Sequence, residues 1–468
     1  MRKKLLTIII TVTMFMTMIL GCNQEKENTN YGEPVNSDFK GIGFEWDMYD
    51  SMDNWSSEIY TYLKGCADDF KPSTIRVMFD IDKYCVSFSD NLMPIYDFET
   101  ESMKNVYDIL QYCQDNDVNV AIGLWHARHE GSYVNDAIHD EGNTLFAKVA
   151  VDMLAHIINI KKYSCVKYLV PYNEPNYTRR RRNNVLIDPY TLWSECMNNL
   201  IDEMSKRVFL SEVLIAAPDV SSMNDSAKWI EDSVKDFDNN IGVYQLHTYT
   251  SDYLVSTGGY RDRLNRAVSK ANDTGKQFWI YESGISDGIV SGQGQTKIKT
   301  YDYVLGMTDM TIQAVLAGVD GMLYWALDSK MHQVNGVDSD FGMINSQTKE
   351  LRPWYYSSTL ISRCLPKGCK IFQGEDYKNV RSIYSINDKQ TYAIGVNRED
   401  EAKSIKFQID SDTDAIKVYI YLLNEQDVFL NDNKQIIPSL ILDKSFKDGI
   451  ELTVPKQSSV IISTEQFF

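Results

Sequence analysis

Two glutamates in this chain stand at the ends of apolar runs. Glu174 closes the run YLVPYNE, and Glu282 closes the run FWIYE. A carboxylate at the end of an apolar strand is costly as packing, because its charge must be paired or desolvated. Two carboxylates that meet at one site are suited to acid–base and nucleophilic work, and cleavage of a glycosidic bond needs such a pair. Buried glutamates held in salt bridges are the alternative interpretation.

These two runs belong to a set of eight, and the stretches between them have helical periodicity. The runs cover residues 42–47, 73–80, 119–126, 166–175, 212–219, 241–249, 277–284 and 321–328. Apolar strands that alternate with helices indicate a parallel sheet covered on both faces. Eight units predict an α/β fold of the (β/α)8 TIM barrel type, in which catalytic side chains lie at the carboxyl ends of the strands. An open doubly wound sheet is disfavoured because no Gly-rich phosphate loop follows any run.

The pattern changes near the C-terminus. After Lys370 the chain consists of short β-rich runs separated by Asn, Asp, Gly and Lys turns. Such runs without helices predict an antiparallel β-sandwich. We therefore expect a catalytic barrel over residues 41–366 and a C-terminal β-sandwich over residues 367–468.

The N-terminus has the plan of a secretory signal. Three basic residues precede the apolar run Leu5–Leu20, and Gly21 and Cys22 follow it. The end of this segment resembles the lipobox of bacterial lipoproteins, which implies a signal peptide over residues 1–21, lipidation of Cys22 and a polar tether over residues 22–40. The expected location is the bacterial cell envelope or cell surface. An uncleaved anchor is the alternative, although the run is short for a span of about 20 residues.

Composition excludes several classes of function. The chain has 65 acidic and 47 basic residues and a formal charge of −18, which argues against a nucleic-acid partner. Membrane contact is expected through the lipid anchor only, and the protein is expected to be a monomer. Seven cysteines besides Cys22 are an odd number and do not form a disulfide framework, although Cys364 and Cys369 flank a turn that could let them bridge. The scattered histidines and the lack of a CxxC pair predict no metal and no cofactor.

The motif Asn-Glu-Pro after the fourth run, with a second glutamate 108 residues later in the seventh, resembles glycoside hydrolase clan A. These retaining (β/α)8 glycosidases include families 5, 30 and 39, and Asn-Glu-Pro-Asn is most similar to family 39. The resemblance implies that Glu174 is the general acid/base and that Glu282 is the nucleophile of a covalent glycosyl-enzyme. It also implies that Asn173 binds the 2-hydroxyl of the sugar. We expect the pKa values of the two carboxyls to differ, with one protonated and the other ionised.

Further strand ends match the clan pattern. The resemblance implies that Arg76 lies beneath the nucleophile and keeps Glu282 ionised, since a nearby guanidinium favours the charged carboxylate. His247 and Tyr249 match a His-x-Tyr motif whose tyrosine faces the nucleophile, and Trp325 matches an aromatic platform under the cleaved sugar. For each of these residues, interior packing or ion pairing is the alternative interpretation.

Other candidates are less specific. Glu45 and Trp46 on the first run, and Trp125 and His126 on the third, are candidates for sugar binding, with plain packing as an equal alternative. Glu45 is also the main rival for a catalytic carboxylate. The chain departs from the clan pattern in the four arginines of Arg179–Arg182, which are either a solvated loop or a site for carboxylate or sulfate groups of an anionic glycan.

The predicted function is that of a retaining glycoside hydrolase that cleaves β-glycosidic bonds of a carbohydrate, either a polysaccharide or an oligosaccharide. A non-catalytic surface glycan-binding lipoprotein and a transglycosylase with the same residues are the alternatives. A remote third option is an unrelated barrel enzyme that uses Glu45 or Asp328, which the fold alone does not exclude.

Overall fold

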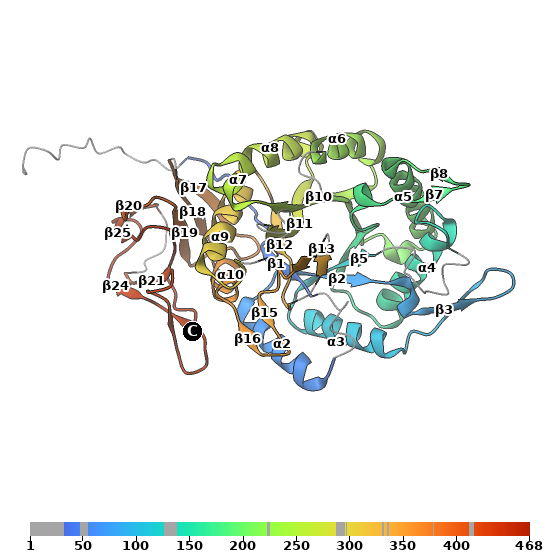
Figure 1. Cartoon of the computed structure of the whole chain (residues 1–468), viewed down its shortest axis with the longest axis horizontal. Helices are drawn as coiled ribbons and strands as arrows, with labels where there is room; N and C mark the ends of the chain where they lie inside the picture. Colours follow the sequence, from blue (N-terminus) through green and yellow to red (C-terminus); the bar gives the residue numbers. More distant parts are fainter. Residues whose placement is uncertain are drawn as a thin grey trace, which may run out of the picture. The chain divides into compact units, whose positions relative to one another are not determined.

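Eight parallel strands close into a barrel in the computed structural model, and their order around the barrel follows the sequence (Figure 1). The strands are β1 (Ile42–Glu45), β2 (Thr74–Phe79), β5 (Asn119–Leu124), β6 (Val166–Val170), β9 (Leu214–Val220), β10 (Ile241–Thr250), β11 (Gln277–Ile285) and β12 (Gly321–Tyr324). Each of the eight predicted runs overlaps one of them, and β9, β10 and β11 extend one residue beyond their runs. The predicted (β/α)8 barrel is therefore confirmed.

The structure describes residues 32–46, 55–125, 138–221, 225–286, 295, 297–329, 332–334, 337–377, 379–410 and 416–468. The predicted signal peptide, Cys22, the start of the tether and His126 lie outside these residues. Within the described ranges, no helix is both long and apolar enough to cross a membrane.

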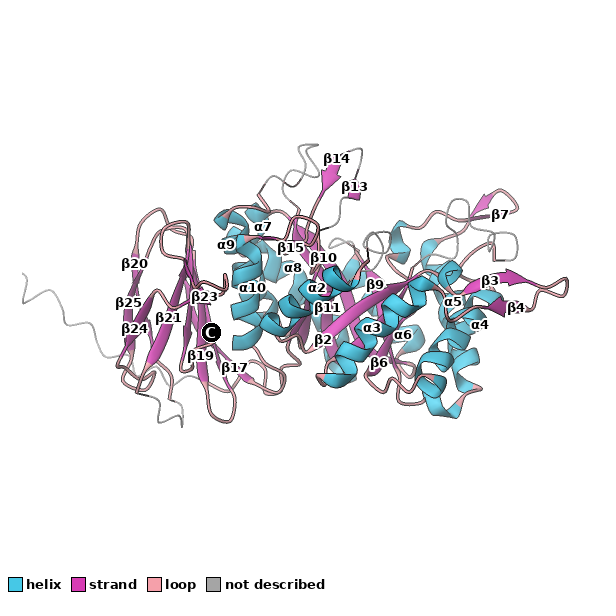
Figure 2. Cartoon of the chain, turned by 90° about the horizontal axis from the view of Figure 1, so that it is seen from below, coloured by secondary structure: helices cyan, strands magenta, loops and turns pink. Residues whose placement is uncertain are grey.

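Helices surround the barrel (Figure 2). They are α2 (Ser57–Phe70), α3 (Glu101–Asp115), α4 (Thr144–Ala155), α5 (Pro189–Ser205), α6 (Ser226–Phe237), α8 (Gly259–Ala271), α9 (Tyr301–Leu316) and α10 (Pro353–Cys364), with the short α7 (Asp252–Ser256) before α8. Ser56, Thr100, Asn143 and Asp188 cap the first four of these helices, because each side chain accepts a hydrogen bond from a backbone N–H of the first turn.

Hairpins extend the loops that follow three barrel strands. They pair β3 (Cys85–Phe88) with β4 (Pro94–Tyr96), β7 (Arg181–Arg182) with β8 (Val185–Leu186), β13 (His332–Val334) with β14 (Val337–Ser339), and β15 (Ile344–Asn345) with β16 (Glu350–Leu351). Because these loops start at the carboxyl ends of the strands, they belong to the end of the barrel where catalytic residues are expected.

Apolar side chains from alternate strand positions form a second, smaller core beside the main one. This cluster consists of Ala121, Tyr168, Val170, Ala216, Val243, Trp279, Tyr281 and Leu323. The residues between them, such as Phe278 and Ile280, belong to the larger core that includes the helices. Gly321 leaves room for this packing, since a Cβ there would lie 2.7 Å from the Trp279 indole. The barrel interior is thus packed solid below the polar strand ends.

The C-terminal region is rich in antiparallel strands. One six-stranded sheet has the order β17-β18-β19-β26-β21-β24, and β20 pairs with β25 and β22 with β23. The bounds are β17 (Lys370–Tyr377), β18 (Val380–Ile386), β19 (Thr391–Asn397), β20 (Lys403–Phe407), β21 (Val418–Leu423), β22 (Phe429–Leu430), β23 (Ile436–Ile437), β24 (Leu440–Leu442), β25 (Ile450–Val454) and β26 (Ser458–Ser463). The two-layer sandwich and the boundary at residue 367 stay predictions.

Helix α9 connects the barrel to this sheet. It packs against β18, β19 and β26, so that polar residues on its second face are buried as well. Among them, Asp309 forms ion pairs with Arg381 at 2.9 Å and with Arg398 at 2.5 Å. A buried carboxylate requires such partners. Residues Glu33–Phe468 accordingly form one compact unit.

The structure changes two expectations, one about the tether and one about a disulfide. The predicted tether extends to residue 40, but its last residues are packed: Val35 N–H donates to Ile371 O at 2.8 Å, Phe39 N–H donates to Cys369 O at 3.0 Å, and Phe39 is buried. These backbone hydrogen bonds give the segment a fixed place that a free linker lacks. Cys364 and Cys369 are both free and buried, so the bridge considered for them is not formed.

Candidate active site

Arg76 is the centre of a buried polar cluster at the carboxyl ends of the strands. Its guanidinium lies 2.5 Å from Glu282 Oε1, 3.0 Å from Asn173 Oδ1 and 2.9 Å from Asp219 Oδ2, and Glu45 Oε2 is 3.4 Å away. These partners come from β11, the end of β6, β9 and β1. Burial opposes the charge of Arg76, but the surrounding carboxylates raise its pKa well above the ordinary value.

Gly123 on the neighbouring strand β5 leaves space for the Arg76 side chain. A Cβ at Gly123 on β5 would lie 3.1 Å from Arg76 Nε and closer still to the sulfur of Met78. A larger residue at position 123 would therefore crowd the Met78 and Arg76 side chains.

An irregularity in β11 aims Glu282 into the site. Leu246 of β10 pairs with Ile280, but His247 pairs with Glu282, so Tyr281 is an extra residue in β11. An extra residue reverses the alternation of side chains beyond it. Glu282 consequently shares the face of His247, although Ile280, two residues earlier, contacts the helices. Its Oε2 atom accepts a hydrogen bond from Tyr249 Oη at 2.7 Å.

Glu174 follows β6 and lies across from Glu282. Its backbone has a φ of 45°, in the left-handed region that residues other than glycine rarely adopt. His247 Nδ1 is 3.2 Å from Glu174 Oε1 and 3.3 Å from Glu282 Oε2. A carboxylate oxygen of Glu174 and one of Glu282 lie within 4.8 Å of each other. The Glu174 side chain is 28% exposed and that of Glu282 is 7% exposed, so Glu174 is the more open of the two.

The surrounding charges determine the protonation of these groups. Burial acts against the imidazolium, but Asp219 and Glu282 outweigh it and raise the pKa of His247 to about 10. Burial would raise the pKa of Glu174, but the contact with His247 outweighs it and holds that pKa below its ordinary value. Burial raises the pKa of Glu282, against the opposing effects of His247 and Arg76.

These directions differ from the expected pattern of a protonated Glu174 beside an ionised Glu282. The reason is that His247 lies between the two carboxylates, which raise its pKa. The surrounding charges therefore favour a proton on the imidazole ring over one on Glu174.

Glu174, His247 and Glu282 are also the group among the described residues that could hold a metal ion. The neighbouring Arg76 already supplies positive charge to Glu282 at 2.5 Å, and His247 Nε2 lies 2.8 Å from Asp219. A divalent cation here would face a buried guanidinium, which is unfavourable. The cluster is better described as a carboxylate pair neutralised by Arg76 and His247.

Aromatic rings form one side of the site. Trp325 Nε1 donates to Glu45 Oε1 at 3.2 Å. The Trp325 ring contacts Tyr249, with centroids 5.9 Å apart, and Phe341 at 5.2 Å. Phe341 was not predicted, because it lies in the long loop after β12. The strand residue Gly284 leaves space for it, since a Cβ there would lie 2.7 Å from the Phe341 ring.

Asp219 was also missed by the sequence analysis. It is fully buried and contacts Arg76, His247 and Gln245. A signal for it existed, because Asp219 closes the fifth apolar run as Glu174 and Glu282 close the fourth and seventh.

Three sequence candidates are not part of this cluster. Trp46 is buried against Tyr60 and Tyr112 of helices α2 and α3, so its predicted role in sugar binding is replaced by core packing. Trp125 follows β5 at the same end of the barrel and is partly exposed. The carboxylate of Asp328 accepts hydrogen bonds from the backbone of Ser329 and Ser346, which assigns it to loop structure.

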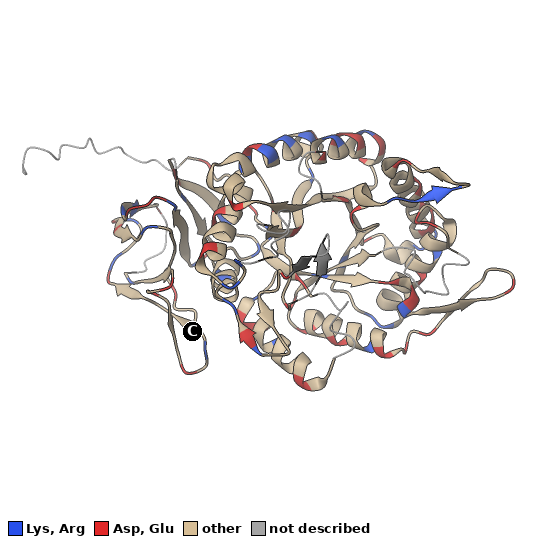
Figure 3. Cartoon of the chain, in the orientation of Figure 1, with Lys and Arg blue, Asp and Glu red and all other residues tan. Residues whose placement is uncertain are grey.

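The arginine loop is largely paired. Arg180 binds Glu141 through two nitrogens at 2.5 and 3.1 Å, and Arg182 binds Asp140 at 2.6 and 2.7 Å and Glu195 at 2.6 Å. Figure 3 shows strand β7 of this loop in blue at one edge of the barrel. Acidic residues of this chain thus already occupy two of the four guanidinium groups.

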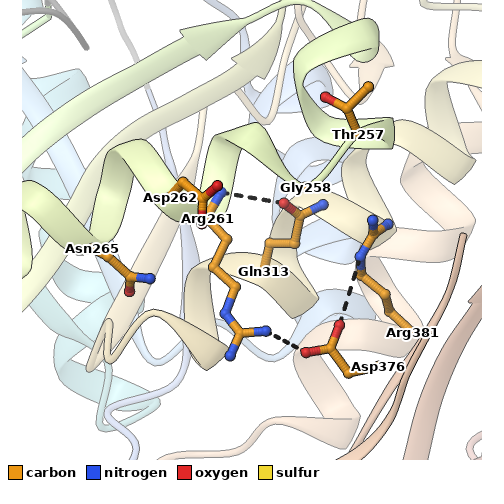
Figure 4. A pocket seen from close by; sticks show the side chains of 8 residues that line it. All are labelled: Thr257, Gly258, Arg261, Asp262, Asn265, Gln313, Asp376 and Arg381. Atoms are coloured by element: carbon orange, nitrogen blue, oxygen red, sulfur yellow. Dashed lines mark hydrogen bonds and ion pairs between the residues drawn. The ribbon is translucent and has the colours of Figure 1, made fainter. Parts of the chain in front are cut away.

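A polar pocket of about 390 Å³ lies elsewhere, between helices α8 and α9 and the C-terminal sheet (Figure 4). Arg261 pairs with Asp376 at 2.5 Å, and Arg381 lies 4.0 Å from the same carboxylate. Arg381 also pairs with Asp309, which does not line the pocket, and neither Glu174 nor Glu282 is among the lining residues.

The barrel and its opposed carboxylates define the class of glycoside hydrolases. Residues 31–330 match the family described as Cellulase (glycosyl hydrolase family 5), and the chain belongs to this family. It is therefore a glycosidase of the clan that the sequence motif indicated. No curated protein matches the chain.

Solved structures with the same fold come from related glycoside hydrolase families. A GH30 endoxylanase from Clostridium papyrosolvens C71 superimposes with a TM-score of 0.61 at 14% identity, covering 92% of this chain and 98% of that one. The GH39 enzyme from Xanthomonas axonopodis pv. citri has a TM-score of 0.62 at 11% identity, covering 92% and 95%. A GH39 β-xylosidase from Caulobacter crescentus has a TM-score of 0.59 at 11% identity, covering 93% and 98%.

Proposed function

We propose that this glycosidase cleaves β-glycosidic bonds with retention of anomeric configuration, through a covalent glycosyl-enzyme. One observation carries the proposal: oxygens of Glu174 and Glu282 lie within 4.8 Å of each other. Retaining enzymes place their carboxyl groups about 5–5.5 Å apart, whereas inverting enzymes need about 6.5–9.5 Å to admit a water between them.

In the first step Glu282 attacks the anomeric carbon while Glu174 protonates the leaving oxygen. The neighbouring imidazolium of His247 supplies the proton that Glu174 needs. In the second step Glu174 takes a proton from water, which attacks the anomeric carbon and releases Glu282. The greater exposure of Glu174 suits a group that must reach first the leaving group and then water.

The other residues orient these two groups and the sugar. Arg76 and Tyr249 each donate to one oxygen of Glu282, which directs its lone pairs and stabilises the carboxylate released in the second step. Asn173 is held by Arg76 beside the site and is assigned to the 2-hydroxyl. Trp325, oriented by Glu45, provides the ring face on which the sugar stacks.

We propose a neutral β-linked glucan or xylan as the substrate class. The family description names cellulase, and the structural neighbours include an endoxylanase and a β-xylosidase. The aromatic wall of Trp325, Tyr249 and Phe341 suits the apolar face of such sugars. A transglycosylase would use the same residues and differ only in the acceptor.

A panel of glycans tests this proposal. Wild-type protein is incubated with cellulose, mixed-linkage glucan, xylan, mannan and a uronate-rich glycan, and new reducing ends are measured. We expect release from a neutral β-glucan or xylan. Binding to these glycans without any release would instead support a non-catalytic glycan-binding protein.

The arginine loop provides a prediction about substrate charge. Because Arg180 and Arg182 are paired with acids, the variants Arg180→Ala and Arg182→Ala are expected to change kcat/KM for neutral and uronate-bearing glycans by the same factor. Their thermal stability should fall, since each variant removes an arginine that pairs with a buried acid, Glu141 or Asp140. Exposed Lys206→Ala serves as the control for loss of one positive charge. A selective loss on the uronate-bearing glycan would restore the anionic-substrate hypothesis.

We also propose that the protein is exported and anchored to the cell envelope through a lipid on Cys22. The basic residues, the apolar run and the Gly-Cys end support this proposal. Cys22→Ala is expected to move the protein from the membrane fraction to the soluble exported fraction, as measured by fractionation and blotting. Cys66→Ala, at a buried cysteine of helix α2, is the matched control and should stay with the membrane. Membrane retention of the Cys22 variant would contradict lipidation at this residue.

A further inference from the structure

We infer that Asp219 is a positioning residue that keeps one proton of His247 on Nε2, so that the proton on Nδ1 is the one exchanged with the catalytic carboxylates. This inference rests on the proposed function. Asp219 is fully buried and contacts His247, so we assign it a role that acts through His247.

The geometry around Asp219 supports this role. Its Oδ1 atom lies 2.8 Å from His247 Nε2 and accepts from Gln245 Nε2 at 2.6 Å, and its Oδ2 atom accepts from Arg76 at 2.9 Å. Arg76 Nη1 also lies 3.1 Å from His247 Nε2, but a guanidinium cannot accept a hydrogen bond, so a proton on Nε2 is directed at the nearer Asp219 Oδ1. A carboxylate that accepts from three donors is held in its ionised form. Burial works against that charge, but Arg76 and His247 outweigh it, and the pKa of Asp219 is lowered.

The backbone places Asp219 in this position by an irregularity of β9. Gln245 of β10 pairs with Pro218 and Leu246 pairs with Val220, so Asp219 is an extra residue in β9. Its φ of 68° is in the left-handed region, which is unfavourable for a residue other than glycine. Backbone strain of this kind persists where the surrounding contacts demand it. The strained conformation turns the carboxylate towards the ring nitrogen of His247.

The consequence concerns which proton of His247 can move. Asp219 remains ionised, so the Nε2 proton stays with the ring. The Nδ1 atom is 3.2 Å from Glu174 Oε1. In the transfer, the Nδ1–H bond breaks, its electron pair stays on Nδ1, and an O–H bond forms on Glu174. The products are a neutral His247 and the protonated acid that glycoside cleavage requires, and the reverse transfer restores the imidazolium.

The pH dependence follows from the groups around the ring. The charged and titratable groups that face His247 are Asp219 from β9, Arg76 from β2, Glu174 after β6, Glu282 from β11 and Tyr249 from its own strand. Asp219 raises the pKa of His247, so loss of its charge lowers that pKa and the Nδ1 proton is lost at a lower pH. The alkaline limb of the pH profile of kcat/KM should therefore also move to lower pH.

Asp219→Asn tests this inference, since the amide oxygen can still accept from Nε2 while the charge is removed. We expect the alkaline limb of kcat/KM to move down by about 1–3 pH units, the range that one neighbouring charge produces. Asp309→Asn is the matched control, because it removes an equally buried aspartate with arginine partners at the contact of α9 with the sheet, and its limb should not move. If Asp219→Asn is folded and active and the alkaline limb of its pH profile is that of the wild type, the inference is overturned and the proposed function stands.

A second measurement does not depend on whether Asp219→Asn folds. In wild-type protein labelled with ¹⁵N-histidine, the His247 signals are assigned by their absence in His247→Gln. We expect Nε2 to stay protonated across the titration and Nδ1 to lose its proton well above pH 7. A neutral ring at pH 7 that carries its proton on Nδ1 would contradict the inference. Full turnover of natural glycans by Glu282→Ala would instead contradict the proposed function itself.

Discussion

Replacing Glu282 by alanine is expected to abolish turnover of natural glycans, with kcat reduced on the order of 10⁶-fold, as for removal of the nucleophile in other enzymes with covalent intermediates. The reason is that Glu282 is the carboxylate opposite Glu174, with an oxygen of each within 4.8 Å of the other. Glu45, the rival in the sequence, is buried and engaged with Arg76 and Trp325. Initial rates with the glycan identified in the panel measure the effect.

Rescue by a small external nucleophile provides a second test of the role of Glu282. Azide should restore cleavage of an activated aryl β-glycoside by Glu282→Ala and yield the α-glycosyl azide, because azide fills the space of the missing carboxylate and attacks the same face. Asp328→Asn is the control, since Asp328 closes the eighth run but belongs to loop structure, and its turnover should stay near that of the wild type. Full turnover by Glu282→Ala without azide would refute the assignment of the nucleophile.

Replacing Glu174 by glutamine is expected to give a different pattern, in which the loss depends on the leaving group. General acid catalysis contributes about 10²–10⁴-fold, so natural glycans with poor leaving groups should lose that much in kcat. Glycosides of dinitrophenol leave without protonation, and their first step should be nearly unaffected. The two substrates are compared in kcat/KM, which reports the step that forms the glycosyl-enzyme.

The pH profile provides the control for this assignment. Because Glu174 and His247 share the proton that reaches the leaving group, the alkaline limb seen with natural glycans should disappear in Glu174→Gln. Asn176→Asp, two residues away in the same turn, keeps Glu174 and should retain the limb. An equal loss on both leaving groups would assign Glu174 to structure and not to proton transfer.

Much of the barrel could be predicted from the sequence, because its strands are apolar runs bounded by polar residues. Strict alternation also places Arg76 on β2, and His247 and Tyr249 on β10, on the inner face. The same alternation excludes Trp46, which follows the inward Glu45 and therefore points to helices α2 and α3. Of the two alternatives for Trp46, the structure supports packing, because the side chain points away from the inner face of the barrel.

Other parts of the site could not be derived in this way. The orientation of Glu282 and of Asp219 depends on one extra residue in each of β11 and β9, and such bulges have no simple sequence signal. Phe341 reaches the site from a loop. The arginines of the loop after β6 find their acids at Asp140 and Glu141, about 40 residues away in the chain. Long-range pairing of this kind is determined by tertiary packing.

The protonation of the site is another property that the sequence motif did not predict. The motif predicted a protonated Glu174 and an ionised Glu282, and it gave His247 no charge. Burial beside Asp219 and Glu282 raises the pKa of His247 to about 10, so the ring carries the proton. The raised pKa depends on Asp219, which was absent from the predicted site, and on Glu282, which was part of it.

The stereochemistry of the first product tests the central claim most directly. The β-glycan that wild-type protein cleaves in the panel is followed by ¹H NMR from the first minutes, before mutarotation mixes the anomers. We predict that the β-anomer of the new reducing end appears first, because displacement by Glu282 and then by water inverts the anomeric carbon twice. Initial appearance of the α-anomer would contradict the proposed pairing of Glu174 and Glu282.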